Sequence, residues 1–131
     1  MLMPKAAAKI GKNGHRPSAG LHVLGRISVR PGSVLKRMSS AKRFVSQVIR
    51  SNGLHELGSY YHEFSGGGFT GVICLVESHI AMHTWPEFGW LTLEVYLCDY
   101  SRDNSDKCRQ VFGQIADYFR PVVIKKNEIK R

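Results

Sequence analysis

The chain has 131 residues, 43% of them hydrophobic, and a net charge of +9, which suits one domain with a modest core. No apolar run is long enough for a membrane helix, and the first twenty residues lack the apolar stretch of a secretory signal. The three cysteines, Cys74, Cys98 and Cys108, follow no disulfide spacing, so we expect reduced thiols in a cytoplasmic protein without a membrane segment.

The beginning of the chain is strongly basic. Residues 1–55 hold eleven Lys or Arg and no Asp or Glu, whereas residues 56–131 hold eight basic and ten acidic residues. Residues 1–19 are predicted to be a disordered basic tail, and residues 20–131 a single domain. This charge raises the hypothesis of a non-enzymatic nucleic-acid-binding module. No aromatic residue lies among the basic ones before Phe44, so we do not favour nucleic acid as the partner.

Apolar periodicity predicts the first two elements. Residues 21–29 alternate roughly and predict a strand that ends at Pro31-Gly32. Ser33 is the expected N-cap of a helix that ends at Asn52-Gly53. The apolar stripe of this helix comprises Val34, Leu35, Met38, Ala41, Val45, Val48 and Ile49.

The remainder predicts four strands and a second helix. Residues 54–64 form a strand, a glycine turn follows, and residues 69–76 form a buried strand. Residues 78–85 continue extended. Residues 90–98 alternate, with Leu91, Leu93, Val95 and Leu97 on one face. Asp103 or Ser105 caps a helix whose apolar face is Cys108, Val111, Phe112, Ile115, Ala116 and Phe119. Residues 121–124 are an optional edge strand.

This order of elements predicts an α+β fold. Hairpin-length links favour an antiparallel sheet with two helices on one face. The other face of the sheet would then be uncovered, although it carries histidines, aromatic residues and Cys98. Such a face is a natural place for a partner subunit to pack.

The segment VESHIAMHTWPEFGW, residues 76–90, holds more reactive side chains than a core strand needs. It lacks the G-x-S-x-G elbow of serine hydrolases. His79 and His83 have the spacing of helical zinc ligands, but in a strand this spacing corresponds to about 13 Å. A zinc site completed by Glu87 or Cys98 stays open as a minor alternative, and we predict that no metal is bound.

A fourth reaction class fits this segment better. A serine can attack the carbonyl carbon of the residue before it and turn an amide into an ester. β-Elimination of the ester cleaves the chain and leaves a dehydroalanine, which becomes a pyruvoyl group at the new N-terminus. The chemistry needs an activated serine, a base for its Cα proton, and a hydroxyl or amide that holds the oxyanion. Ser78, His83 and Thr70 could supply all three.

The run GVICLVESHIAMHTWPEFG, residues 71–89, resembles the processing-site motif of bacterial and archaeal S-adenosylmethionine decarboxylase proenzymes. The similarity extends in register from about residue 22 to residue 98, and more loosely through the last helix. It implies cleavage between Glu77 and Ser78, which would give a β chain of residues 1–77 and an α chain of residues 78–131.

The resemblance also implies roles for individual residues. They are Ser78 (the pyruvoyl group, which forms a Schiff base with the substrate), His83 (the processing base), Thr70 (the processing hydroxyl), Cys98 (the proton donor), Glu87 (binding of the ribose hydroxyls) and Phe64 (an aromatic of the substrate pocket). The pyruvoyl group would do without pyridoxal phosphate or a metal. The family further implies an obligate homodimer with active sites at the subunit junction, an α/β/β/α sandwich.

The implied function is decarboxylation of S-adenosylmethionine for spermidine and other polyamine synthesis. The family's processing serine is Thr70 here, and its usual proline and aromatic before this segment are Gly66 and Gly67. Its first strand usually carries an acid and two aromatics where this chain has Arg26-Ile27-Ser28. Losing those rings removes cation–π contacts of roughly 0.5–2 kcal/mol each. A decarboxylase of the same build that acts on another amino acid, ornithine or arginine, is therefore a second hypothesis.

The predicted strand 78–85 raises a geometric problem. Ser78 and His83 are five positions apart, so a regular strand puts them on opposite faces, and a bulge or a flexible Ser78 is required. Among the other histidines, His22, His55 and His62 are expected to have surface or packing roles, and His79 is expected to be structural and not catalytic. Cys74 and Cys108 are expected to be small buried side chains.

Overall fold

The computed structural model describes residues 19–30, 32–100 and 102–131. The predicted disordered tail lies outside these residues, apart from Ala19. In chain order the elements are β1 (Gly20–Val29), the 3₁₀ helix η1 (Gly32–Lys36), α1 (Met38–Ser51), β2 (Glu56–Glu63), β3 (Phe69–Leu75), β4 (Ser78–Trp85), β5 (Trp90–Cys98), α2 (Ser105–Tyr118) and β6 (Pro121–Lys130).

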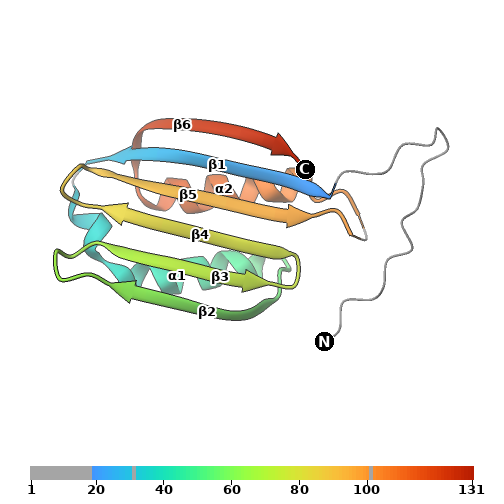
Figure 1. The fold of residues 1–131 in the computed structure, drawn as a ribbon, viewed down its shortest axis with the longest axis horizontal. Helices are drawn as coiled ribbons and strands as arrows, with labels where there is room; N and C mark the ends of the chain where they lie inside the picture. Colours follow the sequence, from blue (N-terminus) through green and yellow to red (C-terminus); the bar gives the residue numbers. More distant parts are fainter. Residues whose placement is uncertain (1–18, 31, 101) are drawn as a thin grey trace.

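The strands form one antiparallel sheet in the order β2-β3-β4-β5-β1-β6. Both helices lie on the same side of this sheet (Figure 1). The predicted α+β class is therefore confirmed. Neither helix among the described residues is long and apolar enough to span a membrane.

The core lies between the sheet and the helices. The four alternating residues of β5 that were predicted to face inward are at most 1% exposed. All six residues of the predicted apolar face of the second helix are buried as well. The sequence periodicity therefore assigned the inner face of these two elements correctly, because burial of one stripe or one strand face sets that period.

Several local predictions were wrong. Ser33 does not cap α1: a 3₁₀ turn comes first, and Arg37 is the N-cap, with no side-chain bond. Asn104 is the N-cap of α2, although the Asp103 carboxylate accepts a hydrogen bond from the Ser105 N–H at 2.8 Å. β3 is not wholly buried, because every second residue faces away from the helices, and Cys74 is exposed.

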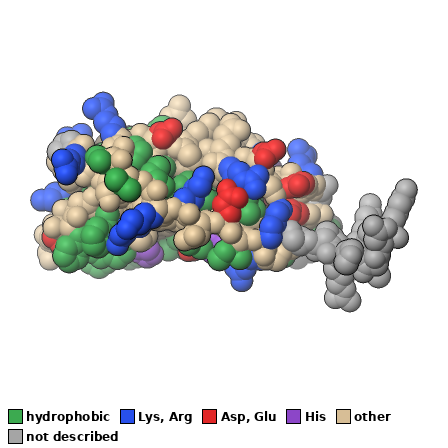
Figure 2. Space-filling model, turned by 90° about the horizontal axis from the view of Figure 1, so that it is seen from above, with side chains coloured by type: hydrophobic (Ala, Val, Ile, Leu, Met, Phe, Trp, Pro, Cys, Tyr) green, Lys and Arg blue, Asp and Glu red, His purple; other side chains and the backbone are tan. Residues whose placement is uncertain are grey.

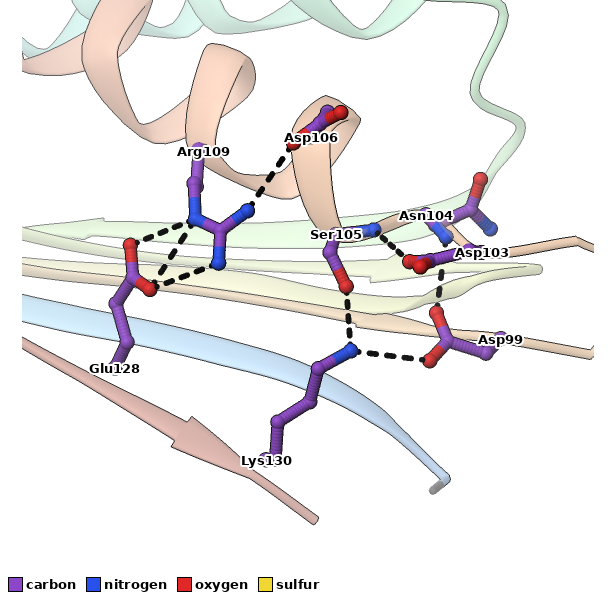
Figure 3. A network of polar contacts seen from close by, with 8 residues as sticks. All are labelled: Asp99, Asp103, Asn104, Ser105, Asp106, Arg109, Glu128 and Lys130. Carbon is purple, nitrogen blue, oxygen red and sulfur yellow. Dashed lines mark hydrogen bonds and ion pairs between the residues drawn. The ribbon is translucent and has the colours of Figure 1, made fainter. Parts of the chain in front are cut away.

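β6 is longer than the optional strand of the sequence prediction, and polar contacts attach it to α2 (Figure 3). Arg109 of α2 donates from Nε to Glu128 Oε1 at 2.9 Å and from Nη2 to Glu128 Oε2 at 3.1 Å. Lys130 lies 3.6 Å from Asp99, the residue after β5. The contacting residues of β6, Glu128 and Lys130, lie beyond Ile124, where the apolar residues that predicted the strand end.

The face of the sheet that points away from the helices has no cover among the described residues. We call it the open face. Its exposed apolar side chains include Tyr60 of β2 and Val72 of β3, which pair across the two strands. Strand alternation also puts His83, Thr70, Glu94 and Cys98 on this face, opposite to their buried neighbours.

Candidate functional site

Thr70 and His83 meet at one end of the open face. They are cross-strand partners on β3 and β4, and Thr70 Oγ1 lies 2.9 Å from His83 Nδ1 in a hydrogen bond. The bond orients the imidazole ring. Phe64 and Glu87 join these two residues in the wall of one cavity of about 550 Å³. Four of the residues singled out in the sequence therefore gather in one place.

Ser78 and Cys98 lie at the opposite end of the sheet. Ser78 begins β4, next to the turn that holds Glu77, and Cys98 ends β5. The Cys98 backbone N–H donates to the carbonyl oxygen of Glu77 at 2.8 Å. That oxygen belongs to the peptide bond between Glu77 and Ser78. A backbone N–H in this place could hold negative charge on the carbonyl oxygen.

The backbone at Ser78 is strained. Its φ is +138°, a value that L residues other than glycine rarely adopt. Such a conformation costs on the order of 1–3 kcal/mol and persists only where the surroundings hold it in place. The sequence analysis required a bulge or a flexible Ser78 to bring this residue to His83. The pairing of β4 with β3 and β5 has no register shift, and the irregularity is confined to the conformation of Ser78.

The two groups of residues do not meet within one chain. Ser78 pairs with Leu75 and Leu97, whereas His83 pairs with Thr70 and Thr92 further along β4. Five residues of a strand span about 17 Å. Ser78 and His83 are therefore too far apart for direct contact within one chain.

His22, His79 and Glu94 form the only group of potential metal ligands found among the described residues, with donor atoms within 4.8 Å of one another. His79 Nε2 is 2.8 Å from Glu94 Oε1, and His22 Nε2 is 3.6 Å from Glu94 Oε2. Ligand atoms about 2 Å from a tetrahedral zinc lie roughly 3.3 Å apart, further than the first pair. Within the group only His79 and Glu94 are hydrogen-bonded, and the buried His22 Nε2 has no hydrogen-bond partner among the described residues. Both imidazole rings pack near Tyr96.

The three cysteines have different surroundings. Cys108 is buried, lies within hydrogen-bonding distance of the Leu21 and Val95 carbonyls, and has a pKa raised chiefly by burial. Cys98 is partly accessible on the open face, and Cys74 is exposed on that face. Cys98 is thus the thiol that combines access with a position beside Ser78.

Sequence reasoning missed two contacts around Glu77. His55, expected to have only a surface or packing role, contacts the Glu77 carboxylate twice, from its backbone N–H and from Nδ1. The Cys98 N–H was also missed, because a backbone group leaves no trace in the residue pattern. His55 is 22 positions from Glu77 in the sequence, so only the pairing of the surrounding strands brings them together.

Arg26 lines a second cavity of about 440 Å³ on the open face. Its guanidinium lies over the Trp90 ring at 4.7 Å from the centroid. Lys125, Glu94 and His83 line the same cavity, and no phenyl or indole ring is among its lining residues. This cavity is therefore lined by charged groups of both signs, and the His83 imidazole is the one aromatic ring among its lining residues.

Comparisons with a family model and with known proteins all point to the same family. The model of the S-adenosylmethionine decarboxylase family matches residues 21–131. An S-adenosylmethionine decarboxylase proenzyme of Syntrophomonas wolfei is 32% identical over 114 residues, covering 87% of each chain. One of Persephonella marina is 37% identical over 79 residues, 60% of this chain, and the match spans only 59% of that relative's length.

A solved structure is also similar. The crystal structure of the adenosylmethionine decarboxylase from Aquifex aeolicus matches with a TM-score of 0.78 and 29% sequence identity. The match covers 88% of this chain and 92% of that one. The likeness therefore extends over most of both chains.

Proposed function

Because the chain belongs to the S-adenosylmethionine decarboxylase family, we propose that it is a self-processing, pyruvoyl-dependent decarboxylase of S-adenosylmethionine that serves polyamine synthesis. The observation that carries this proposal is the geometry of the Glu77–Ser78 bond. Its carbonyl oxygen accepts a hydrogen bond from the Cys98 N–H, and its serine is held at a φ of +138°. The hydrogen bond would stabilise negative charge on this oxygen when the serine hydroxyl attacks, and cleavage of the peptide bond would release the strain at Ser78.

Cleavage then proceeds in balanced steps. Ser78 Oγ loses its proton to a base and adds to the carbonyl carbon of Glu77, and the C–N bond breaks as the nitrogen takes up a proton. The base next removes the Cα proton of Ser78 and the Cβ–Oγ bond breaks. The main-chain carboxylate of Glu77 leaves as the new C-terminus of the first fragment. The remaining enamine tautomerises to an imine, and water replaces ammonia to give the pyruvoyl group.

A second copy of the chain supplies the missing half of this site. The partner's His83 acts as the base on Ser78, and the partner's Thr70 orients that base through the 2.9 Å hydrogen bond. The two open faces pack together, which covers the exposed Tyr60 and Val72 and builds an α/β/β/α sandwich. The separation of Ser78 from His83 along β4 supports this homodimer.

The same arrangement serves decarboxylation. The pyruvoyl group at residue 78 condenses with the α-amine of the substrate and withdraws electrons as CO₂ leaves, without pyridoxal phosphate or a metal. The Cys98 thiol, next to it at the end of β5, donates the proton to Cα. Phe64 and Glu87 of the partner bind the substrate, the ring by stacking and the carboxylate by accepting hydrogen bonds from the ribose hydroxyls.

Intact mass and CO₂ release test this proposal. The purified protein should contain fragments of residues 1–77 and 78–131, the second beginning with a pyruvoyl group, and Ser78→Ala should remain one chain. Labelled CO₂ should appear from S-adenosylmethionine. An uncut wild-type chain would refute the self-processing reaction, whereas a cleaved protein without this activity would refute only the substrate.

One observation favours a second substrate class, an amino acid without an adenosyl group such as ornithine or arginine. The cavity around Arg26 offers no phenyl or indole ring to a sulfonium or an adenine. Glu94 in its wall could accept a basic side chain instead. Release of CO₂ from ornithine or arginine, with none from S-adenosylmethionine, would select this alternative.

A nucleic-acid-binding module is less well supported. On the face that Figure 2 shows, the Lys and Arg side chains are scattered, and Asp and Glu side chains lie among several of them. A duplex or single strand needs a continuous basic surface along its phosphates. Salt-dependent DNA binding by an uncleaved chain would restore this hypothesis.

The hydroxyl of Thr70 should matter for cleavage, whereas its methyl group should not. Thr70→Val removes the hydrogen bond to His83 with little change of shape, and we expect cleavage to slow by roughly tenfold, as for loss of one hydrogen bond to a reacting group. Thr70→Ser, which keeps the hydroxyl, should cleave at least as fast as the wild type. Time courses of cleavage after cell-free synthesis measure both, and equal rates for the two variants would contradict the assignment.

A further inference from the structure

His55 binds the residue on the upstream side of the Glu77–Ser78 bond. Its backbone N–H donates to Glu77 Oε1 at 3.0 Å, and its ring Nδ1 lies 2.9 Å from Glu77 Oε2. In the same place the Val76 N–H donates to the His55 carbonyl oxygen at 2.9 Å. Three hydrogen bonds therefore join His55 to the two residues that precede Ser78.

The pair is electrostatically favourable. The Glu77 side chain is 17% exposed. Its burial alone would raise the carboxyl pKa, but the hydrogen bonds from His55 and the nearby imidazole together hold that pKa below its ordinary value. An ionised carboxylate only accepts hydrogen bonds, so Nδ1 must carry a proton. The contact is thus a charge-assisted hydrogen bond, the stronger kind.

His55 is itself anchored to the body of the protein. Leu54, the residue before it, is buried, and its N–H donates to the Ile49 carbonyl at the end of α1. Gly53 makes the sharp turn out of that helix with a φ of +68°. The backbone on which His55 sits is therefore fixed to α1, not to a free loop.

The contacts around the Glu77–Ser78 bond act from two sides. His55 holds the Glu77 carboxylate, the Cys98 N–H holds the Glu77 carbonyl oxygen, and strand pairing with Leu75 and Leu97 holds Ser78. A residue at a φ of +138° relaxes unless its neighbours over-determine it. The contact on the Glu77 side chain is one of these restraints, and the only one of them that acts through a side chain.

We propose that His55 is a positioning residue for self-cleavage: by binding the Glu77 side chain it keeps the carbonyl carbon of Glu77 in front of the Ser78 hydroxyl. The inference rests on the proposed self-processing reaction. His55 takes no part in proton transfer. It acts on the first step, in which the C–Oγ bond forms and the C–N bond breaks, because that step depends on how the reacting atoms are aligned.

Two substitutions of His55 separate this role from a general effect on folding. His55→Ala removes the side-chain bond and should slow the appearance of fragments 1–77 and 78–131 by roughly tenfold, the order for losing one charge-assisted hydrogen bond. His55→Asn keeps an N–H donor close to the place of Nδ1 and should cleave within about threefold of the wild-type rate. Pulse-labelled cell-free synthesis of the full chain, followed by gel separation, gives both rates.

Further variants complete the experiment. Glu77→Gln weakens the same contact, so the double variant with His55→Ala should be no slower than the slower single variant. Glu56→Gln, an exposed carboxylate of neighbouring β2, is the matched control and should cleave like the wild type. Each substitution is also made with Ser78→Ala, where thermal unfolding of the uncut chain shows that the fold is retained.

The outcomes distinguish the two proposals. A wild-type chain that never cleaves refutes the proposed self-processing, whatever His55 does. A wild-type chain that cleaves while His55→Ala cleaves equally fast refutes the positioning role alone. A His55→Asn chain as slow as His55→Ala, at unchanged thermal stability, also refutes it, since the donor would then not be the relevant property.

Discussion

Two variants that do not cleave alone are expected to restore cleavage to each other when they are expressed together: Ser78→Ala and His83→Ala. The reason is the separation of about 17 Å between these residues along β4. If the nucleophile of one subunit meets the base of the other, a mixed dimer has one complete site, made of Ser78 from one chain and His83 from the other. Its second site lacks both residues. Random assortment makes about half of the dimers mixed, so about a quarter of all chains should be cleaved.

Differently tagged chains make the result unambiguous. The cleaved chain must be the His83→Ala chain, because it alone retains Ser78. Mixing the two proteins after separate purification should give cleavage only as fast as the dimers exchange subunits. Absence of fragments in a co-expressed sample that contains mixed dimers would contradict a shared site and would require Ser78 and His83 to act within one chain.

The second large effect concerns Cys98. Cys98→Ala should still produce both fragments, because its backbone N–H remains on the Glu77 carbonyl, but CO₂ release per pyruvoyl group should fall by roughly 10²–10⁴-fold. That range is typical for loss of a positioned proton donor. The measurement is kcat on the cleaved protein, normalised by the fraction of chains that carry the pyruvoyl group.

Cys74→Ala is the matched control for this variant. Cys74 is also a free thiol on the open face, on β3 beside His79, and is more exposed than Cys98. Its substitution should leave both cleavage and CO₂ release unchanged. If the two alanine variants lose activity equally, the thiol of Cys98 has no special part in protonation.

The sequence predicted the fold where burial imposes a period. The alternation of residues 91–97 and the helical stripe from Cys108 to Phe119 both turned out to be buried as expected. The prediction of the helix start from the sequence was wrong where packing in the folded protein overrides the preference of a single residue type. Ser33 is a good N-cap by type, yet the 3₁₀ turn that buries Leu35 delays α1 to Met38.

The candidate site was predictable in part for a similar reason. A motif identifies residues, so Thr70, His83, Glu87 and Phe64 could be named in advance, and they share a cavity. A motif says nothing about which strand end each residue occupies. The separation of Ser78 from His83 follows only from the register of β3, β4 and β5. The contact of His55 with Glu77 depends on the same pairing and was missed.

The order of the strands has a consequence for the protein after cleavage. The fragment of residues 1–77 would contain β1, β2 and β3, and the fragment of residues 78–131 would contain β4, β5 and β6. In the sheet, β1 lies between β5 and β6, and β3 lies against β4 (Figure 1). Strands of the two fragments would therefore alternate in one sheet. Neither fragment could dissociate without breaking the hydrogen bonds on both sides of β1 as well as those between β3 and β4. Cleavage of the chain would therefore leave the folded protein in one piece.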